Sequence, residues 1–173
     1  MRYGDEIGMG DDLRLPERYA VRTPMQWSGA PNGGFSRAAP DDLPVKPVAS
    51  GRFRYQRINV EAALRHPRSL LHRIRNMVLA RTEYTEPGSI PFTLITVKPA
   101  AVLGLCYRSE SREVLMLANC SQQAVEAQLP PLAEGYWSPI LEDKFYQDGL
   151  YGGEKARLAL SGYGYRWFSR SLL

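Results

Sequence analysis

The sequence is poor in the residues that build disulfide scaffolds and metal sites. It has two cysteines, Cys106 and Cys120, and two histidines among 173 residues. Two cysteines are too few for a disulfide-rich scaffold or a cysteine-type zinc site. Each lies in an alternating apolar run, where we expect a buried free thiol. Because His66 and His72 are six residues apart, they do not share one face of a helix. We therefore expect no metal and no other cofactor.

The sequence also has no long hydrophobic run. No stretch approaches 18 consecutive apolar residues, so no membrane-spanning helix is predicted. The N-terminal residues 1–6 have no apolar stretch after their charged residues, unlike a secretory signal peptide. We expect a cytoplasmic protein that does not bind membranes.

The chain is too short for a complete (β/α)₈ barrel, which needs roughly 250 residues. Its composition is nevertheless that of a folded protein, with 44% hydrophobic residues, 3 Trp, 10 Tyr and 5 Phe. So many aromatic side chains can build a packed core, which disfavours general disorder.

The net charge of +4 comes from one segment. Residues 52–82 have eight arginines and a single acidic residue, Glu61, whereas charges nearly balance in residues 1–51 and 83–173. No recognised nucleic-acid motif or interleaved aromatic residue accompanies these arginines. We expect a solvated helix face there, and no binding of nucleic acid.

The same segment contains the clearest helical pattern. Apolar residues recur on one helical stripe: Leu70, Leu71, Ile74, Met77 and Val78. They predict a helix over Pro67–Tyr84, because Pro67 suits a first turn and Pro87 follows the end. A shorter helix is predicted over Val60–Arg65, with Asn59 as its N-cap.

After residue 90 the apolar period changes to two. Seven short strands are predicted: Phe92–Val97, Val102–Arg108, Glu113–Asn119, Val125–Leu129, Tyr136–Leu141, Ala156–Leu160 and Tyr163–Ser169. The polar residues Ser109–Arg112 suit a hairpin connection. Short strands separated by turn residues indicate an antiparallel β-sandwich.

Residues 10–51 show neither period and contain 6 of the 13 prolines. A structureless run of this length is uncommon in a compact domain. Its large apolar residues, among them Met25, Trp27 and Phe35, disfavour plain disorder. We therefore predict a long functional loop that packs against a partner.

Two blocks of sequence resemble a known family. Residues 3–11 read YGDEIGMGD and residues 22–27 read RTPMQW. Together they resemble the α-amylase family, glycoside hydrolase family 13, and within it the branch of α-glucosidases and trehalose synthases. The continuations at 32–38 and 58–62 favour the trehalose synthase group, and residues 163–168 resemble the terminal strand of that group.

The resemblance implies a predominantly β fold in two parts. Residues 1–87 would be a remnant of the catalytic barrel, made of its last strand, a long irregular loop carrying RTPMQW, and its last helix. Residues 88–173 would be a C-terminal antiparallel β-sandwich of the α-amylase domain C type. The chain would thus hold an incomplete (β/α)₈ barrel.

The resemblance also implies an activity for a longer parent enzyme. Trehalose synthases interconvert maltose and trehalose by a retaining mechanism, in which two carboxyl groups lie roughly 5 Å apart. In the family the catalytic Asp, Glu and second Asp precede the YGDEIGMGD block. No catalytic residue is therefore assigned here, and Asp5 and Glu6 are not given those roles.

The residues that the resemblance carries over are substrate contacts. Arg22 would bind hydroxyls of the terminal glucose together with an upstream Asp, because its planar guanidinium can bridge a carboxylate and a sugar. Gln26 and Trp27 are the other two candidate substrate-binding residues. For both, a packing role in the loop is the competing hypothesis.

Three hypotheses for the chain itself remain open. It is an inactive fragment of a trehalose synthase-like enzyme, a non-catalytic carbohydrate-binding or assembly module, or a fragment of an α-glucosidase or sucrose isomerase. The partners expected for the parent are maltose and trehalose. The helix Pro67–Tyr84 should expose an apolar patch without a barrel to cover it, so we expect a homodimer or poor order in residues 1–58.

Overall fold

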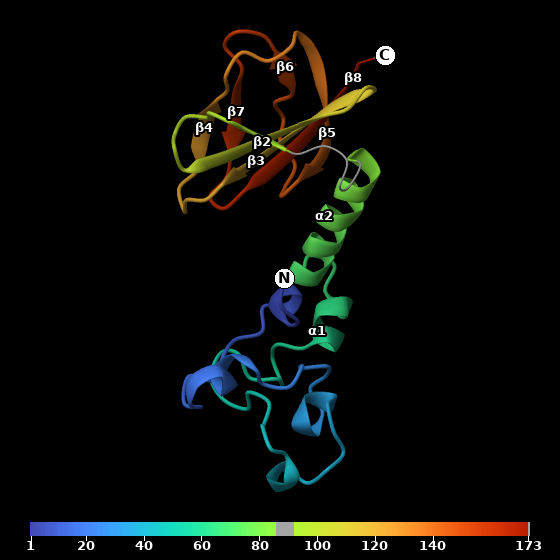
Figure 1. Ribbon diagram of the computed structural model, residues 1–173, viewed down its shortest axis with the longest axis vertical. Helices are drawn as coiled ribbons and strands as arrows, with labels where there is room; N and C mark the ends of the chain where they lie inside the picture. Colours follow the sequence, from blue (N-terminus) through green and yellow to red (C-terminus); the bar gives the residue numbers. More distant parts are fainter. Residues whose placement is uncertain (86–91, 173) are drawn as a thin grey trace. The chain divides into compact units, whose positions relative to one another are not determined.

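The chain folds into two compact units, Met1–Asn76 and Met77–Leu173 (Figure 1). The computed structural model describes residues 1–85 and 92–172. The domain boundary that we predict between residues 87 and 88 lies outside the described residues and stays a prediction.

The first unit is mostly irregular chain punctuated by short turns. It contains four 3₁₀ turns, which are η1 (Asp5–Ile7), η2 (Glu17–Val21), η3 (Pro31–Gly34) and η4 (Pro40–Asp42), followed by the helix α1 (Val60–Arg65). The 32–34 segment forms a turn, in which Asn32, Gly33 and Gly34 all have positive φ.

The structure differs from expectation at the YGDEIGMGD block. No strand occurs among residues 1–85, and η1 occupies the place of the implied last barrel strand. An extended segment needs neighbouring strands for its backbone hydrogen bonds, and the described part of this unit offers none. The chain turns instead through Gly4 and Gly8, with φ of 89° and 71°, and Gly8 N–H donates to the Asp5 carbonyl at 3.1 Å.

A small apolar cluster holds the two sequence blocks and α1 together. Ile7, Met9 and Met25 are buried in it. Four partly buried residues pack around them: Ile58, Val60, Ala63 and Leu71. The irregular segment therefore has a core of its own, built from residues far apart in the sequence.

Both helices form where the pattern predicts them. α1 has the predicted bounds, and Asn59 Oδ1 accepts the capping hydrogen bond from Ala62 N–H at 2.8 Å. The helix α2 (Leu70–Tyr84) begins three residues later than predicted. Ser69 Oγ accepts a hydrogen bond from His72 N–H at 3.4 Å and donates one to the Ala63 carbonyl. The helix therefore begins just after Ser69, and Pro67 lies before it rather than in its first turn.

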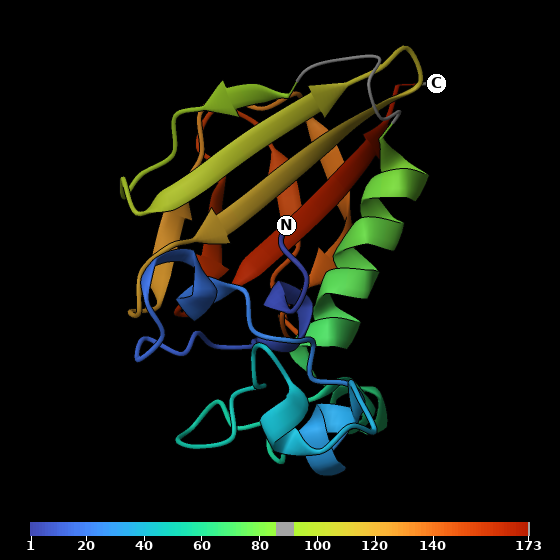
Figure 2. The same cartoon turned by 60° about the horizontal axis from the view of Figure 1, so that its bottom comes forward.

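The second unit is an antiparallel β-sandwich, as predicted (Figure 2). Its strands are β1 (Thr93–Ile95), β2 (Val102–Arg108), β3 (Arg112–Asn119), β4 (Val125–Gln128), β5 (Gly135–Glu142), β6 (Leu150–Gly152), β7 (Arg157–Leu160) and β8 (Tyr165–Ser171). One sheet has the order β1-β2-β3-β8-β5-β6, and β4 pairs with β7 in the other. All seven predicted strands are present, and β6 is an additional short one.

The sandwich core comes from both sheets. Its buried residues are Val97, Val102, Leu115, Leu117, Ala127, Leu129, Trp137, Leu150, Ala156, Leu158, Leu160 and Phe168. Cys106, on β2, is half-buried, and burial raises the pKa of its thiol. The expectation of two buried thiols is therefore met only in part at Cys106, and it is wrong for Cys120, which is exposed because β3 ends at Asn119 and the alternation stops there.

The basic segment is solvated, as expected. All eight arginines between residues 52 and 82 are exposed: Arg52, Arg54, Arg57, Arg65, Arg68, Arg73, Arg75 and Arg81. α2 also leaves Val78 and Leu79 more than half exposed, and Ala80 is its only buried residue.

Candidate functional site

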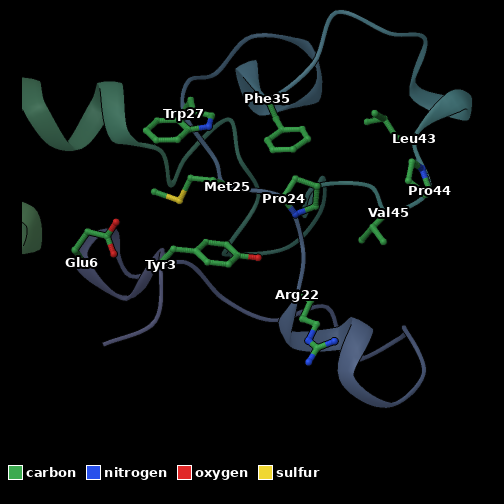
Figure 3. Close-up of a pocket in the computed structure, with 10 residues that line it drawn as sticks. All are labelled: Tyr3, Glu6, Arg22, Pro24, Met25, Trp27, Phe35, Leu43, Pro44 and Val45. Atoms are coloured by element: carbon green, nitrogen blue, oxygen red, sulfur yellow. The ribbon is translucent and has the colours of Figure 1, made fainter.

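A cavity of about 510 Å³ lies in the first unit (Figure 3). Four separate stretches of the irregular chain form it. Its lining residues are Tyr3, Glu6, Arg22, Pro24, Met25, Trp27, Phe35, Leu43, Pro44 and Val45. The walls are thus largely apolar and aromatic, with one carboxylate and one guanidinium among them.

The RTPMQW segment is fixed to the start of α1. The carbonyl oxygens of Gln26 and Trp27 each accept a hydrogen bond of 3.0 Å, from Val60 N–H and Glu61 N–H. These donors belong to the first turn of α1, where N–H groups have no partner within the helix. The first turn of α1, which Asn59 caps, therefore also positions the RTPMQW segment.

Trp27 presents its ring to the cavity. Its backbone N–H donates to the Gly33 carbonyl at 2.8 Å, which holds the residue between α1 and η3. Its side chain stays 51% exposed, and Figure 3 shows the ring near Phe35 and Met25. An exposed indole on a cavity wall can stack on an apolar ring face or donate through its N–H.

Arg22 lies on the opposite side of the cavity from Trp27 (Figure 3). The side chain is exposed, and within residues 1–85 and 92–172 its guanidinium has no ion pair or hydrogen bond. Glu6 is the only carboxylate among the lining residues, and Figure 3 places it away from Arg22. Five N–H donors of Arg22 are therefore open to an acceptor.

Gln26 does not line the cavity. Its side chain is fully buried, and its Nε2 donates to the Phe53 carbonyl at 3.2 Å and to the Ile58 carbonyl. Its Oε1 is buried without a hydrogen-bond partner in the described structure. The structure brings Arg22 and Trp27 to one cavity, and it uses Gln26 to tie the segment to residues 53–58.

A second cavity of about 700 Å³ shares one wall with the first, formed by Leu43, Pro44 and Val45. Asp12 and Arg14 line its other side. Arg14 Nε and Nη2 donate to the two carboxylate oxygens of Asp12 at 2.8 Å each, which lowers the pKa of that carboxyl. The side of the second cavity formed by Asp12 and Arg14 therefore carries an ion pair rather than an isolated charge.

Tyr3, Glu6, Phe35 and the 43–45 wall were not among the predicted site residues. They reach the cavity through loop packing, for example the bond of 2.9 Å from Tyr3 Oη to the Thr23 carbonyl. Tyr3 and Glu6 lie in the YGDEIGMGD block, and Phe35 is among the large apolar residues of the loop, whereas no signal in the sequence marks residues 43–45.

Aromatic walls and an open guanidinium suit the binding of a polyhydroxylated ring, and Glu6 is the only carboxylate among the lining residues. Across the described residues, no group of three or more His, Cys, Asp or Glu side chains could hold a metal ion. No helix in the same part of the chain is long and apolar enough to cross a membrane.

Comparison with known proteins identifies relatives. Residues 3–87 match the family described as "Alpha amylase, catalytic domain". The trehalose synthase of Thermus thermophilus is 37% identical over 169 residues, which cover 96% of this chain and 17% of that protein. The trehalose synthase/amylase TreS of Mycolicibacterium smegmatis is 34% identical over 177 residues, covering 96% of this chain and 30% of that protein.

Solved structures share the fold. Trehalose-6-phosphate hydrolase from Bacillus licheniformis matches with a TM-score of 0.68 at 24% identity, over 91% of this chain and 27% of that one. Trehalulose synthase from Pseudomonas mesoacidophila matches with a TM-score of 0.67 at 22% identity, over 88% and 26%. The chain thus spans less than a third of the length of each of these relatives.

Proposed function

We propose that this chain, which belongs to the α-amylase family, forms part of an enzyme that acts on α-glucosides. The specific activity that we propose is that of a trehalose synthase, interconverting maltose and trehalose. The similarity to two trehalose synthases over 96% of the chain supports this choice. The observation that carries it is the cavity, where Arg22 and Trp27 face a common space with aromatic walls.

The role of the cavity in the proposal is to hold the terminal glucose. Arg22 donates hydrogen bonds to sugar hydroxyls and pairs with a carboxylate supplied from outside these 173 residues. Trp27 stacks on the apolar face of a sugar ring or donates its indole N–H. Gln26 contributes by fixing the backbone of the segment through its bonds to residues 53–58.

The chain alone is proposed to lack catalysis. A retaining glycosidase needs two carboxyl groups roughly 5 Å apart, and Glu6 is the only carboxylate among the residues that line the cavity. The purified chain incubated with maltose should therefore form neither trehalose nor glucose. Formation of trehalose would overturn this part of the proposal.

A chimera tests the site directly. This chain would replace the 169 matching residues of the Thermus thermophilus trehalose synthase, and the rate of trehalose formation from maltose would be measured. Replacing Arg22 by Lys in the chimera removes the bidentate fork. We expect kcat/KM to fall by about 100-fold, or about 2.7 kcal/mol of transition-state stabilisation. Arg18→Lys, an exposed arginine outside both cavities, is the control and should change little.

Sister activities form the second candidate. The oligo-1,6-glucosidase of Heyndrickxia coagulans is 30% identical over 79% of the chain, so an α-glucosidase or sucrose isomerase parent is a specific alternative. Product analysis of a longer protein containing this chain, given maltose, sucrose and isomaltose in turn, would separate these activities. A non-catalytic binding module would instead bind glucosides without converting any of them.

The proposal includes association of two copies. Val78 and Leu79 expose apolar surface on α2, and such surface is commonly covered by a partner. A homodimer is the partner that we propose for the isolated chain.

A further inference from the structure

Two tyrosines form an exposed pair at the edge of the sandwich. Tyr136 on β5 and Tyr151 on β6 are register partners of the antiparallel ladder. Their ring centroids are 5.2 Å apart and their planes are inclined by 54°. Tyr136 is 49% exposed and Tyr151 is 70% exposed. We call this pair the tyrosine platform; β6 is the last strand of its sheet (Figure 1).

The backbone holds the platform on the outer face. The next register pair, Trp137 with Leu150, points to the opposite side and is buried in the sandwich core. Side chains alternate along a strand, so the buried pair fixes the outward direction of the two tyrosines. The Trp137 indole N–H also donates to the Ala133 carbonyl at 3.2 Å, which anchors the start of β5.

Glycines leave the platform open. A Cβ atom at Gly149 would lie 3.2 Å from Cε2 of Tyr136, so the ring lies over a residue without a side chain. Gly135 and Gly153 have no atom within 4 Å of the place where a side chain would begin. Among the contacts of the described residues, neither phenol hydroxyl has a hydrogen-bond partner. Two ring faces and two hydroxyls are thus available together.

We propose that the tyrosine platform binds a chain of α-linked glucoses, across two successive sugar units. One face of a glucose ring exposes C–H groups, which stack on an aromatic ring, and the ring hydroxyls can bond the phenol groups. An α-linked glucan bends at every linkage, so neighbouring sugars present inclined faces that suit rings tilted by 54°. A β-1,4-linked glucan is flat and would stack on only one of the two rings.

The platform is separate from the cavity of the proposed enzyme site. Tyr136 and Tyr151 belong to the second unit, whereas Arg22 and Trp27 belong to the first. The inference therefore goes beyond the proposed activity, and each can fail without the other.

The competing interpretation is purely structural. A cross-strand aromatic pair stabilises a hairpin without any ligand. Both interpretations predict lower stability when a tyrosine is replaced, so stability cannot separate them. Affinity for a glucan can, because only the platform proposal links these rings to a ligand.

The test is a titration of the full chain with maltoheptaose, followed by the NMR signals of ¹³C-labelled tyrosine rings and by calorimetry. We expect saturable binding that shifts the Tyr136 and Tyr151 ring signals. Tyr151→Thr removes the ring but places a β-branched residue of high strand propensity there, and it should weaken binding by about tenfold. Tyr163→Asn is the matched control: Tyr163 is 68% exposed in the same unit, and its φ of 53° suits asparagine. It should leave the affinity unchanged within about twofold.

Two further arms complete the test. Cellohexaose, the β-linked analogue, should bind at least about tenfold more weakly than maltoheptaose, and Trp27→Ala should leave the ring shifts of the platform intact. Absence of ring shifts in the wild-type chain would overturn the proposal without any variant. Equal binding of the two glucans, or unchanged affinity in folded Tyr151→Thr, would overturn it as well.

Discussion

The buried side chain of Arg166, on β8, links that strand to β5 and to the loop between β5 and β6. It is 1% exposed, and its Nε donates to Glu142 Oε1 at 2.6 Å. Its Nη1 donates to Asp148 Oδ1 at 2.9 Å and its Nη2 to the Asp148 carbonyl at 2.7 Å. The guanidinium also lies 4.1 Å from the ring centre of Tyr146. The loop between β5 and β6 is therefore tied to β8 by one residue.

Replacing Arg166 by Met should lower the free energy of unfolding by about 3 kcal/mol, because Glu142 loses its partner while largely buried. Urea unfolding followed by tryptophan fluorescence measures this. Arg157→Met is the control, since Arg157 pairs with Glu126 on the surface and such pairs contribute about 0–1 kcal/mol. Equal losses in the two variants would contradict this account of Arg166.

The two thiols should react at different rates. Burial raises the pKa of Cys106, so less of its reactive thiolate is present near pH 8, whereas Cys120 is exposed. Iodoacetamide should therefore label Cys120 first, and Cys106 labelling should speed up as the pH rises above its ordinary pKa. Peptide mass spectrometry of a time course checks the order. Faster labelling of Cys106 would mean that β2 opens more readily than its burial indicates.

Residue identity alone indicated only some of the residues that line the cavity. The RTPMQW block indicated Arg22 and Trp27, which line the cavity, and also Gln26, which is buried behind it. The sequence does not show which side of the segment each residue occupies, because the segment is irregular. Its orientation depends on hydrogen bonds to α1 and η3, which are contacts between distant residues.

At the scale of elements, the N-terminus of α1 affects both the stability of that helix and the position of the RTPMQW segment at the cavity. Asn59 is buried, caps the helix through Oδ1 and donates from Nδ2 to the Tyr55 carbonyl at 2.8 Å. Asn59→Ala should cost about 1–2 kcal/mol of stability in the first unit. Far-UV circular dichroism during thermal unfolding measures the loss. Asn76→Ala, exposed within α2, is the control and should be neutral or slightly stabilising.

Elements with a repeated pattern could be predicted, and those set by tertiary contacts could not. α1 and β2 have the predicted bounds, because a cap and a clear period mark them. β6 escaped prediction since three residues between glycine-rich turns show no period. The pairing of β8 with both β3 and β5 depends on long-range contacts that no local pattern encodes.

At the scale of the whole molecule, apolar surface predicts association. α2 repeats apolar residues on one stripe, yet Ala80 is its only buried residue, and Val78 and Leu79 are more than half exposed. Water contact with this surface is unfavourable by roughly 25 cal/mol per Å², so a second copy that covers it stabilises the pair. We therefore expect the purified chain to be dimeric at micromolar concentration.

Light scattering after size-exclusion chromatography measures the mass. Replacing Val78 by Lys and Leu79 by Glu should shift the chain to 19.5 kDa, the mass of one copy. Leu94→Lys is the control, because Leu94 is equally apolar and 71% exposed but lies on β1 rather than α2. If the control loses the dimer and the double variant keeps it, the interface lies at the β1 edge of the sheet and not on α2. If the wild-type chain is monomeric, the exposed apolar residues of α2 do not drive association, and the prediction is wrong.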